Sequence, residues 1–250
     1  YDVYSLPFKN KIWRKYMTDV VSNADKVITI SGANVDYLKE LTNEEKKLEL
    51  VYNGFSPRLF HPIEREIARK ELGLNEKKRI CVAVGNVIRI KGHKDLIRAI
   101  SLLPREYDDI ELYLVGSGPL LGDLEDLTKE LGLNNRVHFV GVRPHWEIVK
   151  WMNSADLFVL SSLKEGAPVV ALEALACGVP VIGTRVGIVP DIINSNDYGY
   201  VCEVSNPESL AEGIKKGFSK KWNKEKISKY GLNFTWAKAT EKIINIYEDL

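Results

Sequence analysis

Short apolar runs alternate with longer amphipathic segments from residue 79 to residue 217. The apolar runs predict buried strands at 79–85, 110–115, 137–140, 157–160, 180–183 and 199–202. The amphipathic segments predict helices at 94–103, 119–131, 144–153, 169–177, 188–194 and 207–217. Strands and helices that alternate in this way form right-handed βαβ units, which build a parallel sheet with helices on both faces. We therefore expect an α/β, Rossmann-like fold that binds its ligand at the carboxyl ends of the strands.

The chain before residue 60 carries a separate pattern of helices and strands. Residues 8–21 place Ile12, Trp13 and Tyr16 at helical spacing, with basic residues between them. Such a helix lies either on an anionic membrane surface or with its apolar side packed and its basic face in water; we favour packing. A strand at 26–30, a helix at 33–41 and a strand at 48–52 follow, and 222–250 is helical again.

The stretch from 157 to 182 contains the strongest candidate site. Pro168 can open a helix because its fixed φ and missing N–H suit the first turn, and Gly178 can end that helix. The free N–H groups at the helix start attract anions such as phosphate. Glu165 and Glu173 flank these donors, and carboxylates repel phosphate but accept hydrogen bonds from hydroxyl groups. A nucleotide-sugar, with phosphates between two polyols, fits this arrangement.

The two glutamates stand in a longer pattern, Glu165-Gly-x-Pro followed by Glu173-Ala-x-Ala-x-Gly-x-Pro-Val. This pattern resembles the E-x7-E motif of the retaining GT-B glycosyltransferases (glycosyl transferases group 1), which include mannosyltransferases, glucosyltransferases and glycogen synthases. The resemblance implies that Glu165 is a catalytic residue beside the hydroxyls of the donor sugar and that Glu173 holds the ribose hydroxyls. It also implies donor binding by Gly166, Ala167, Pro168 and Val169.

The loop after the strand at 79–85 resembles a second family motif. Gly85-Asn86-Val-Ile-Arg89-Ile-Lys91-Gly-His is similar to the family loop Gly-Arg-x-x-x-x-Lys-Gly, whose cations neutralise the departing nucleoside diphosphate. Asn86 stands where the family usually has arginine, so either Arg89 reaches the diphosphate or Lys91 acts alone. We assign Gly85 and Asn86 to donor binding, and Lys91 and Arg89 to catalysis.

The run Gly116-Ser-Gly118-Pro-Leu-Leu-Gly nearly matches a dinucleotide-binding fingerprint. Its third glycine is displaced by one residue, and the next strand does not end in an acidic residue, so a NAD site is disfavoured, although Arg143 would suit a 2′-phosphate. The same segments resemble the family loops around the nucleotide base, which implies base contacts by Gly116, Gly118, Val142 and Arg143. His138 lies within a predicted strand and is interpreted as a packed residue rather than a catalyst.

Composition narrows the function classes. The 35 basic and 34 acidic residues give a net charge of +1, which offers no electrostatic reason to bind nucleic acid. No apolar run approaches the roughly 20 residues that span a bilayer, and no signal peptide is visible. Cys81, Cys177 and Cys202 lack metal-binding or redox spacing, which indicates buried thiols in a reducing cytosol. We expect a cytoplasmic protein, with the inner face of the membrane as an alternative location, and no metal or cofactor.

These expectations give one domain plan and one function. Residues 1–57 are expected to end an N-terminal acceptor domain, 58–221 to form the donor domain, and 222–250 to cross back as helices. Because the chain does not start with Met, we expect most of the N-terminal domain to precede it, including any part that touches a membrane. The expected reaction is retaining transfer of a hexose from a nucleoside diphosphate sugar to a sugar, lipid or glycan acceptor. The alternatives are a GT-B nucleotide-sugar epimerase, an NADP-binding Rossmann module and a non-catalytic donor-binding module.

Overall fold

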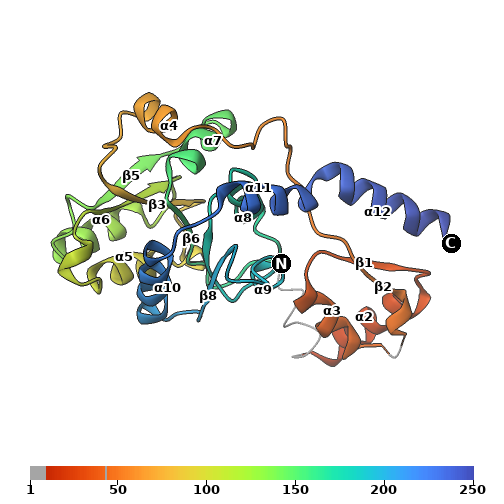
Figure 1. Ribbon diagram of the computed structural model, residues 1–250. Helices are drawn as coiled ribbons and strands as arrows, with labels where there is room; N and C mark the ends of the chain where they lie inside the picture. Colours follow the sequence, from red (N-terminus) through yellow and green to blue (C-terminus); the bar gives the residue numbers. More distant parts are fainter. Residues whose placement is uncertain (1–9, 43) are drawn as a thin grey trace.

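The computed structural model describes residues 10–42 and 44–250, which form a small unit and a large α/β unit (Figure 1). The small unit contains α2 (Lys11–Asn23), β1 (Val27–Thr29), α3 (Gly32–Lys39) and β2 (Leu48–Leu50). Its two strands pair in parallel, with Val27 opposite Leu48. The side chains of Asn10 and Ser31 accept hydrogen bonds from first-turn N–H groups, which fixes where α2 and α3 begin.

The large unit is built on a six-stranded parallel sheet. Its strands are β3 (Arg79–Val84), β4 (Ile110–Val115), β5 (Val137–Gly141), β6 (Leu157–Leu160), β7 (Val181–Thr184) and β8 (Gly199–Cys202). They lie in the order β5-β4-β3-β6-β7-β8, with Cys81 of β3 opposite Leu112 on one side and Leu157 on the other. All six predicted strands form, and the predicted fold class is confirmed.

Helices cover both faces of this sheet (Figure 1). One face carries α4 (Arg65–Leu72), α7 (His145–Ser154), α8 (Val169–Ala176) and α11 (Lys224–Gly231). The other face carries α5 (His93–Ser101), α6 (Leu121–Glu130) and α10 (Pro207–Ser219). The short α9 (Val189–Ile192) follows β7, and α12 (Trp236–Glu248) is the last helix. Because both faces are covered, β4, β6 and β7 are buried along their whole length, as their continuous apolar runs predict.

The strand order reverses between β3 and β6. From β3 the chain moves outward through β4 to β5, returns to β6, and continues through β7 to β8. The loops after β3 and β6 therefore leave neighbouring strands in opposite directions and open a crevice at the carboxyl edge of the sheet. This topology brings the glycine loop at 85–92 next to the loop at 161–168.

The apolar side of α2 is exposed, so the packing interpretation is wrong for the part of the chain that the structure describes. Ile12, Trp13, Tyr16 and Val20 are exposed, and Val21 is the buried residue of this helix. Two strands of three residues each are too little sheet to cover a helix of 13 residues. No described helix is long and apolar enough to cross a membrane. The cytoplasmic or membrane-surface location stays a prediction.

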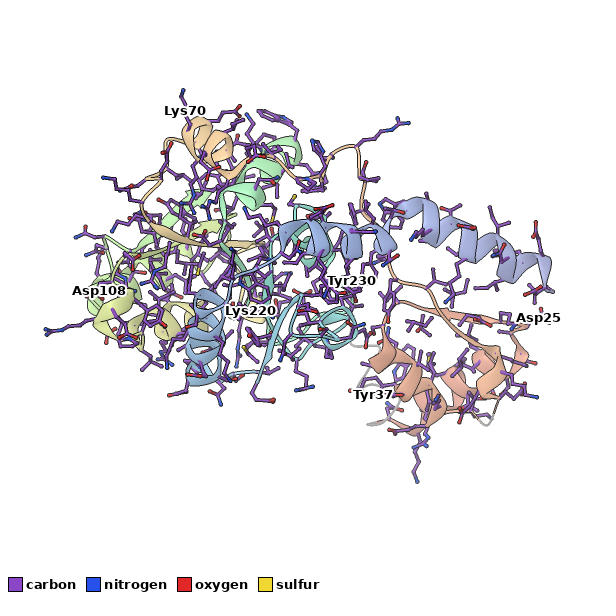
Figure 2. The ribbon with its side chains drawn as sticks, viewed as in Figure 1. Asp25, Tyr37, Lys70, Asp108, Lys220 and Tyr230 are labelled. Atoms are coloured by element: carbon purple, nitrogen blue, oxygen red, sulfur yellow. The ribbon has the colours of Figure 1, made fainter. Side chains whose placement is uncertain are left out.

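The link between the units runs beside the segment that leads into α12. Phe55, after β2, forms a parallel bridge with Thr235. From there α12 packs Ala239 and Ile246 against Val51 of the small unit. Tyr230 of α11 lies at this junction (Figure 2), stacked on Tyr198 with ring centroids 3.7 Å apart. The assignment of the small unit to an acceptor domain stays a prediction.

The sequence analysis did not predict α4, whose buried side includes an arginine. This helix buries Ala68 and Arg69 while Ile67 is exposed. The guanidinium of Arg69 satisfies its donors inside the protein. It donates to the backbone oxygens of Ser154 at 2.9 Å and of Glu76 and Lys78 at 3.0 Å, and to the carboxylate of Asp156 at 2.8 Å.

Asp156, immediately before β6, joins α4 to the sheet. Its Oδ2 accepts hydrogen bonds from Arg69 and from the backbone N–H of Ile80, both at 2.8 Å. Its Oδ1 accepts a bond of 2.5 Å from Arg65. One carboxylate therefore holds two arginines of α4 and the start of β3.

We expect Asp156→Ala to lower the free energy of unfolding by about 3–5 kcal/mol, because the buried cation Arg69 would lose its counterion. Denaturant unfolding measures this loss. Asp126→Ala is the control, since Asp126 forms an exposed pair with Lys129 on α6, and it should cost about 0–1 kcal/mol. Similar losses in both variants would contradict the role given to Asp156.

Candidate active site

Two of the predicted catalytic residues meet at the crevice between β3 and β6. The Nζ of Lys91 lies 2.5 Å from Oε1 of Glu165, and the hydroxyl of Ser162 donates to the same oxygen at 2.7 Å. The side chains of Lys91 and Glu165 are 20% and 13% exposed. Lys91, from the neighbouring loop, thus neutralises the carboxylate of Glu165, and Ser162, from the same loop as Glu165, orients it.

Close backbone packing fixes these two loops against each other. A Cβ at Gly92 would lie 2.0 Å from the carbonyl oxygen of Ser161, and Gly92 has a left-handed φ of +63°. The Ser161 hydroxyl donates to the carbonyl oxygen of Lys91 at 2.9 Å, and the N–H of Leu163 donates to that of Ile90 at 2.7 Å. Glycine is therefore required at position 92, next to Lys91.

The predicted donor-binding residues of the β6–α8 loop lie beside this pair. Pro168 occupies the N-cap position of α8 and provides no side-chain cap. The N–H of Ala171 donates to the carbonyl oxygen of Pro168 at 3.0 Å, which leaves the N–H groups of Val169 and Val170 available to a ligand. Gly187, after β7, packs on the preceding loop, where a Cβ would lie 2.4 Å from the oxygen of Gly166. Ala167 and Val169 pack against the core of the large unit.

Glu173 lies on α8 and is almost fully buried, with 5% exposure. Its Oε1 is 3.2 Å from Nε2 of His145, the first residue of α7. Burial raises the pKa of the Glu173 carboxyl, and the hydrogen bond and charge of His145 lower it in part. The sequence analysis missed His145, because one histidine at a helix start forms no spacing motif.

The glycines of the β4 loop serve close packing between loops. A Cβ at Gly116 would lie 2.0 Å from the oxygen of Gly85, and one at Gly118 would lie 2.4 Å from that of Val87. These glycines seat the β4 loop directly on the β3 loop. Whether they also contact a base stays a prediction.

The β5–α7 loop presents one exposed side chain and one paired charge. Val142 is strongly exposed. The guanidinium of Arg143 forms an ion pair of 3.1 Å with Glu147, which also accepts a hydrogen bond from Trp151. Because its charge is paired, Arg143 is a weak candidate for binding a 2′-phosphate.

Arg89 lies apart from the Lys91–Glu165 pair. It is exposed on the short 3-10 turn Arg89–Lys91 and lines a separate hollow of about 280 Å³. The other residues of this hollow are Val87, Ile88, Gly92, His93, Lys94, Asp95, Leu120, Leu124 and Leu163. Asn86, in the same loop, is also exposed. The structure therefore leaves Lys91 as the cation that faces Glu165.

A second hollow, of about 330 Å³, lies between the small and large units beside Glu165. Its walls are formed by Ser31, Ala33, Asn34 and Tyr37 of the small unit and by Leu163, Lys164, Arg185, Val186 and Gly187 of the large unit. The N–H of Gly32 donates to Oδ2 of Asp191 on α9 at 2.8 Å, which holds the two walls together.

The remaining chemistry-bearing groups are structural. The three cysteines are buried and free, as the sequence predicts. His138 stacks on Tyr113 with centroids 4.6 Å apart, in agreement with a packed residue. Within residues 10–42 and 44–250, no group of three or more His, Cys, Asp or Glu side chains could hold a metal ion.

Comparison with known proteins identifies the family. The model of the family "Glycosyl transferases group 1" matches residues 64–234. The chain belongs to this glycosyltransferase family. It is 33% identical over 192 residues to N-acetyl-alpha-D-glucosaminyl L-malate synthase of Bacillus anthracis, an alignment that covers 77% of this chain and 50% of that protein. It is 28% identical over 246 residues to D-inositol 3-phosphate glycosyltransferase of Corynebacterium urealyticum, covering 92% and 58%.

Solved structures share the fold. HepE of Anabaena in complex with UDP superposes with a TM-score of 0.82 at 22% identity, covering 95% of this chain and 68% of that one. Sucrose-phosphate synthase of Thermosynechococcus elongatus superposes with a TM-score of 0.79 at 26% identity, covering 96% and 62%. The chain spans 50% and 58% of the length of the two curated relatives named above.

We expect Gly92→Ala to destabilise the protein more than Gly132→Ala does. Both glycines have a left-handed φ, near +63° and +67°, so both variants incur the same backbone strain of about 1–2 kcal/mol. A Cβ at Gly132 meets nothing within 4 Å, whereas at Gly92 it meets Ser161, which adds about 1–3 kcal/mol. Denaturant unfolding of both variants measures the difference. Equal losses would show that the two loops move apart without cost.

Proposed function

We propose that the protein is a retaining glycosyltransferase that moves a hexose from a nucleoside diphosphate sugar to a hydroxyl group of an acceptor. The observation that carries this proposal is the Lys91–Glu165 pair at the switch point of the sheet, beside the uncapped start of α8 and the buried Glu173. A solved structure with the same fold, HepE of Anabaena, was determined with UDP-glucose, which supports the donor class.

The donor runs across the crevice in this proposal. Its ribose hydroxyls donate to Glu173, its diphosphate lies between Lys91 and the first turn of α8, and its hexose lies beside Glu165. Each group meets the chemistry that suits it, since carboxylates accept from hydroxyls while an ammonium and free N–H groups bind phosphate. Gly85, Asn86, Gly116, Gly118 and Val142 line the path toward the base.

The acceptor enters from the hollow between the two units, next to Glu165. Two relatives are named for L-malate and for inositol 3-phosphate, and both of these compounds carry free hydroxyl groups. The acceptor of this protein is therefore a hydroxyl compound small enough to reach the hexose through that hollow.

The hydrogen bonds of Glu165 bear on the route by which a retaining transfer would proceed. Oε1 of its carboxylate is engaged by both Lys91 and Ser162, which makes it a poor nucleophile for a covalent intermediate. We therefore propose that the acceptor attacks on the face from which the diphosphate leaves. Catalysis then comes from positioning and from stabilisation of charge on the leaving diphosphate.

The proposal predicts selective nucleotide binding. Calorimetric titration with UDP, GDP and ADP should show saturable binding of one of them, and NADPH should not bind. Glu173→Ala should weaken that affinity about tenfold or more, because hydrogen bonds to a charged group are worth about 1.5–3 kcal/mol. Glu125→Ala, on the exposed side of α6, is the matched control. Binding of NADPH alone would instead support the NADP-binding alternative.

Lys91→Ala should lower kcat/KM by about 2–3 kcal/mol of transition-state stabilisation, or roughly thirty- to a hundredfold, because the leaving diphosphate loses its nearest cation. Steady-state kinetics of sugar transfer measures this, with Lys129→Ala on α6 as the control.

Since protein groups carry the charge of the leaving diphosphate, no metal is required, and a chelator such as EDTA should leave the rate of sugar transfer unchanged. Unaltered kinetics in Lys91→Ala, or a strict need for Mg²⁺ or Mn²⁺, would refute this account.

A further inference from the structure

His145 connects the link between the units to the buried carboxylate of Glu173. It follows Pro144, which ends the β5–α7 loop, so its ring projects from the first turn of α7. The ring lies 5.1 Å from that of the buried Phe60, and its Nε2 lies 3.2 Å from Oε1 of Glu173. The His145 side chain is 67% exposed and that of Glu173 is 7% exposed. The pair thus has one member in solvent and one in the core.

Other ionisable groups near Glu173 are neutral or already paired. On α8 itself, burial raises the pKa of Cys177, so this thiol stays protonated. On α7, Glu147 is paired with Arg143. In the β6–α8 loop, Glu165 is paired with Lys91.

The other two elements near Glu173 bring no charge onto its carboxylate. On α11, the Ser228 hydroxyl donates a hydrogen bond to the carbonyl oxygen of Ala176, and the carbonyl of Lys224 packs on Gly178. The link between the units contributes the apolar ring of Phe60 through His145. Among the described residues, His145 is therefore the hydrogen-bonding partner that faces Glu173.

We propose that His145 is a positioning residue that holds Oε1 of Glu173 through its Nε2–H, so that Oε2 is left to accept a ribose hydroxyl. The inference rests on the proposed function, because it assigns the ribose to Glu173. Oε2 has no hydrogen-bond partner among the described residues, whereas Oε1 is engaged. A ligand hydroxyl that donates to Oε2 would give both carboxylate oxygens of Glu173 a hydrogen-bond partner.

The contact also sets the pH at which the site works. Burial favours the protonated form of Glu173 and raises its pKa, whereas His145 favours the carboxylate and lowers the pKa. A protonated carboxyl loses an acceptor position, so nucleotide affinity falls as the pH drops through the pKa of Glu173. Removal of His145 raises that pKa further, and the fall in affinity then begins at a higher pH.

The test is the affinity for the nucleotide selected above, UDP, GDP or ADP, measured by calorimetry from about pH 5 to pH 8. We expect His145→Ala to weaken binding about tenfold at neutral pH and to move the acid-side fall in affinity to higher pH. His145→Gln should recover most of the affinity at neutral pH, because its amide N–H can donate to the same oxygen. The control is His138→Ala, since His138 lies in β5 and stacks on Tyr113 of β4.

The outcomes separate this inference from the proposed function. A wild type that binds the nucleotide, together with a His145→Ala profile identical in affinity and pH dependence, would overturn the inference and leave donor binding intact. A tenfold loss with an unshifted pH profile would reduce His145 to a packing role and also overturn it. A wild type that binds none of the three nucleotides would overturn the proposed function, and the inference with it.

Discussion

The contact between the backbone of Gly92 and the carbonyl of Ser161 determines where the site forms. These residues lie just beyond β3 and β6, the two strands at which the sheet reverses its order. Because Gly92 has no side chain, the two loops can approach closely enough for the ammonium of Lys91 to contact the carboxylate of Glu165. The strand order places the crevice between β3 and β6, and the close packing of the two loops brings the charged groups of Lys91 and Glu165 together in it.

Partly buried interactions connect the two units. Asp191 on α9 accepts the N–H of Gly32 at the start of α3. Burial and the neighbouring Asp191 charge raise the pKa of Tyr52 to about 12, so this phenol stays neutral between the units. Edge contacts of Phe234 with the rings of Tyr52 and Tyr230 continue the junction. The hollow beside Glu165 therefore has a defined second wall.

Sequence reasoning succeeded where burial forces a simple pattern. β4, β6 and β7 are covered on both faces, so each is mostly apolar in sequence, and the alternation of strands with helices predicts a parallel sheet. The loops that carry Lys91 and Glu165 follow from that topology, because they leave adjacent strands.

It failed where a residue is explained by partners distant in the sequence. Arg69 makes α4 a core helix through hydrogen bonds to Asp156 and to three backbone carbonyls, which no periodicity reveals. The contact of His145 with Glu173 exists because α7 starts beside α8, and the sequence alone does not reveal this.

The Lys91–Glu165 pair gives the proposed reaction a prepared site. An ammonium group has three N–H donors. In the part of the chain that the structure describes, the ammonium of Lys91 donates one hydrogen bond, to Glu165. Its other N–H donors remain available to phosphate oxygens. The ion pair also restricts the side chain of Lys91 to one conformation. The negative charge that develops on the leaving diphosphate then meets a cation that need not move. Glu165 would thus act twice, by facing the hexose and by holding Lys91 in place, which makes a lysine at the end of a surface loop suitable for catalysis.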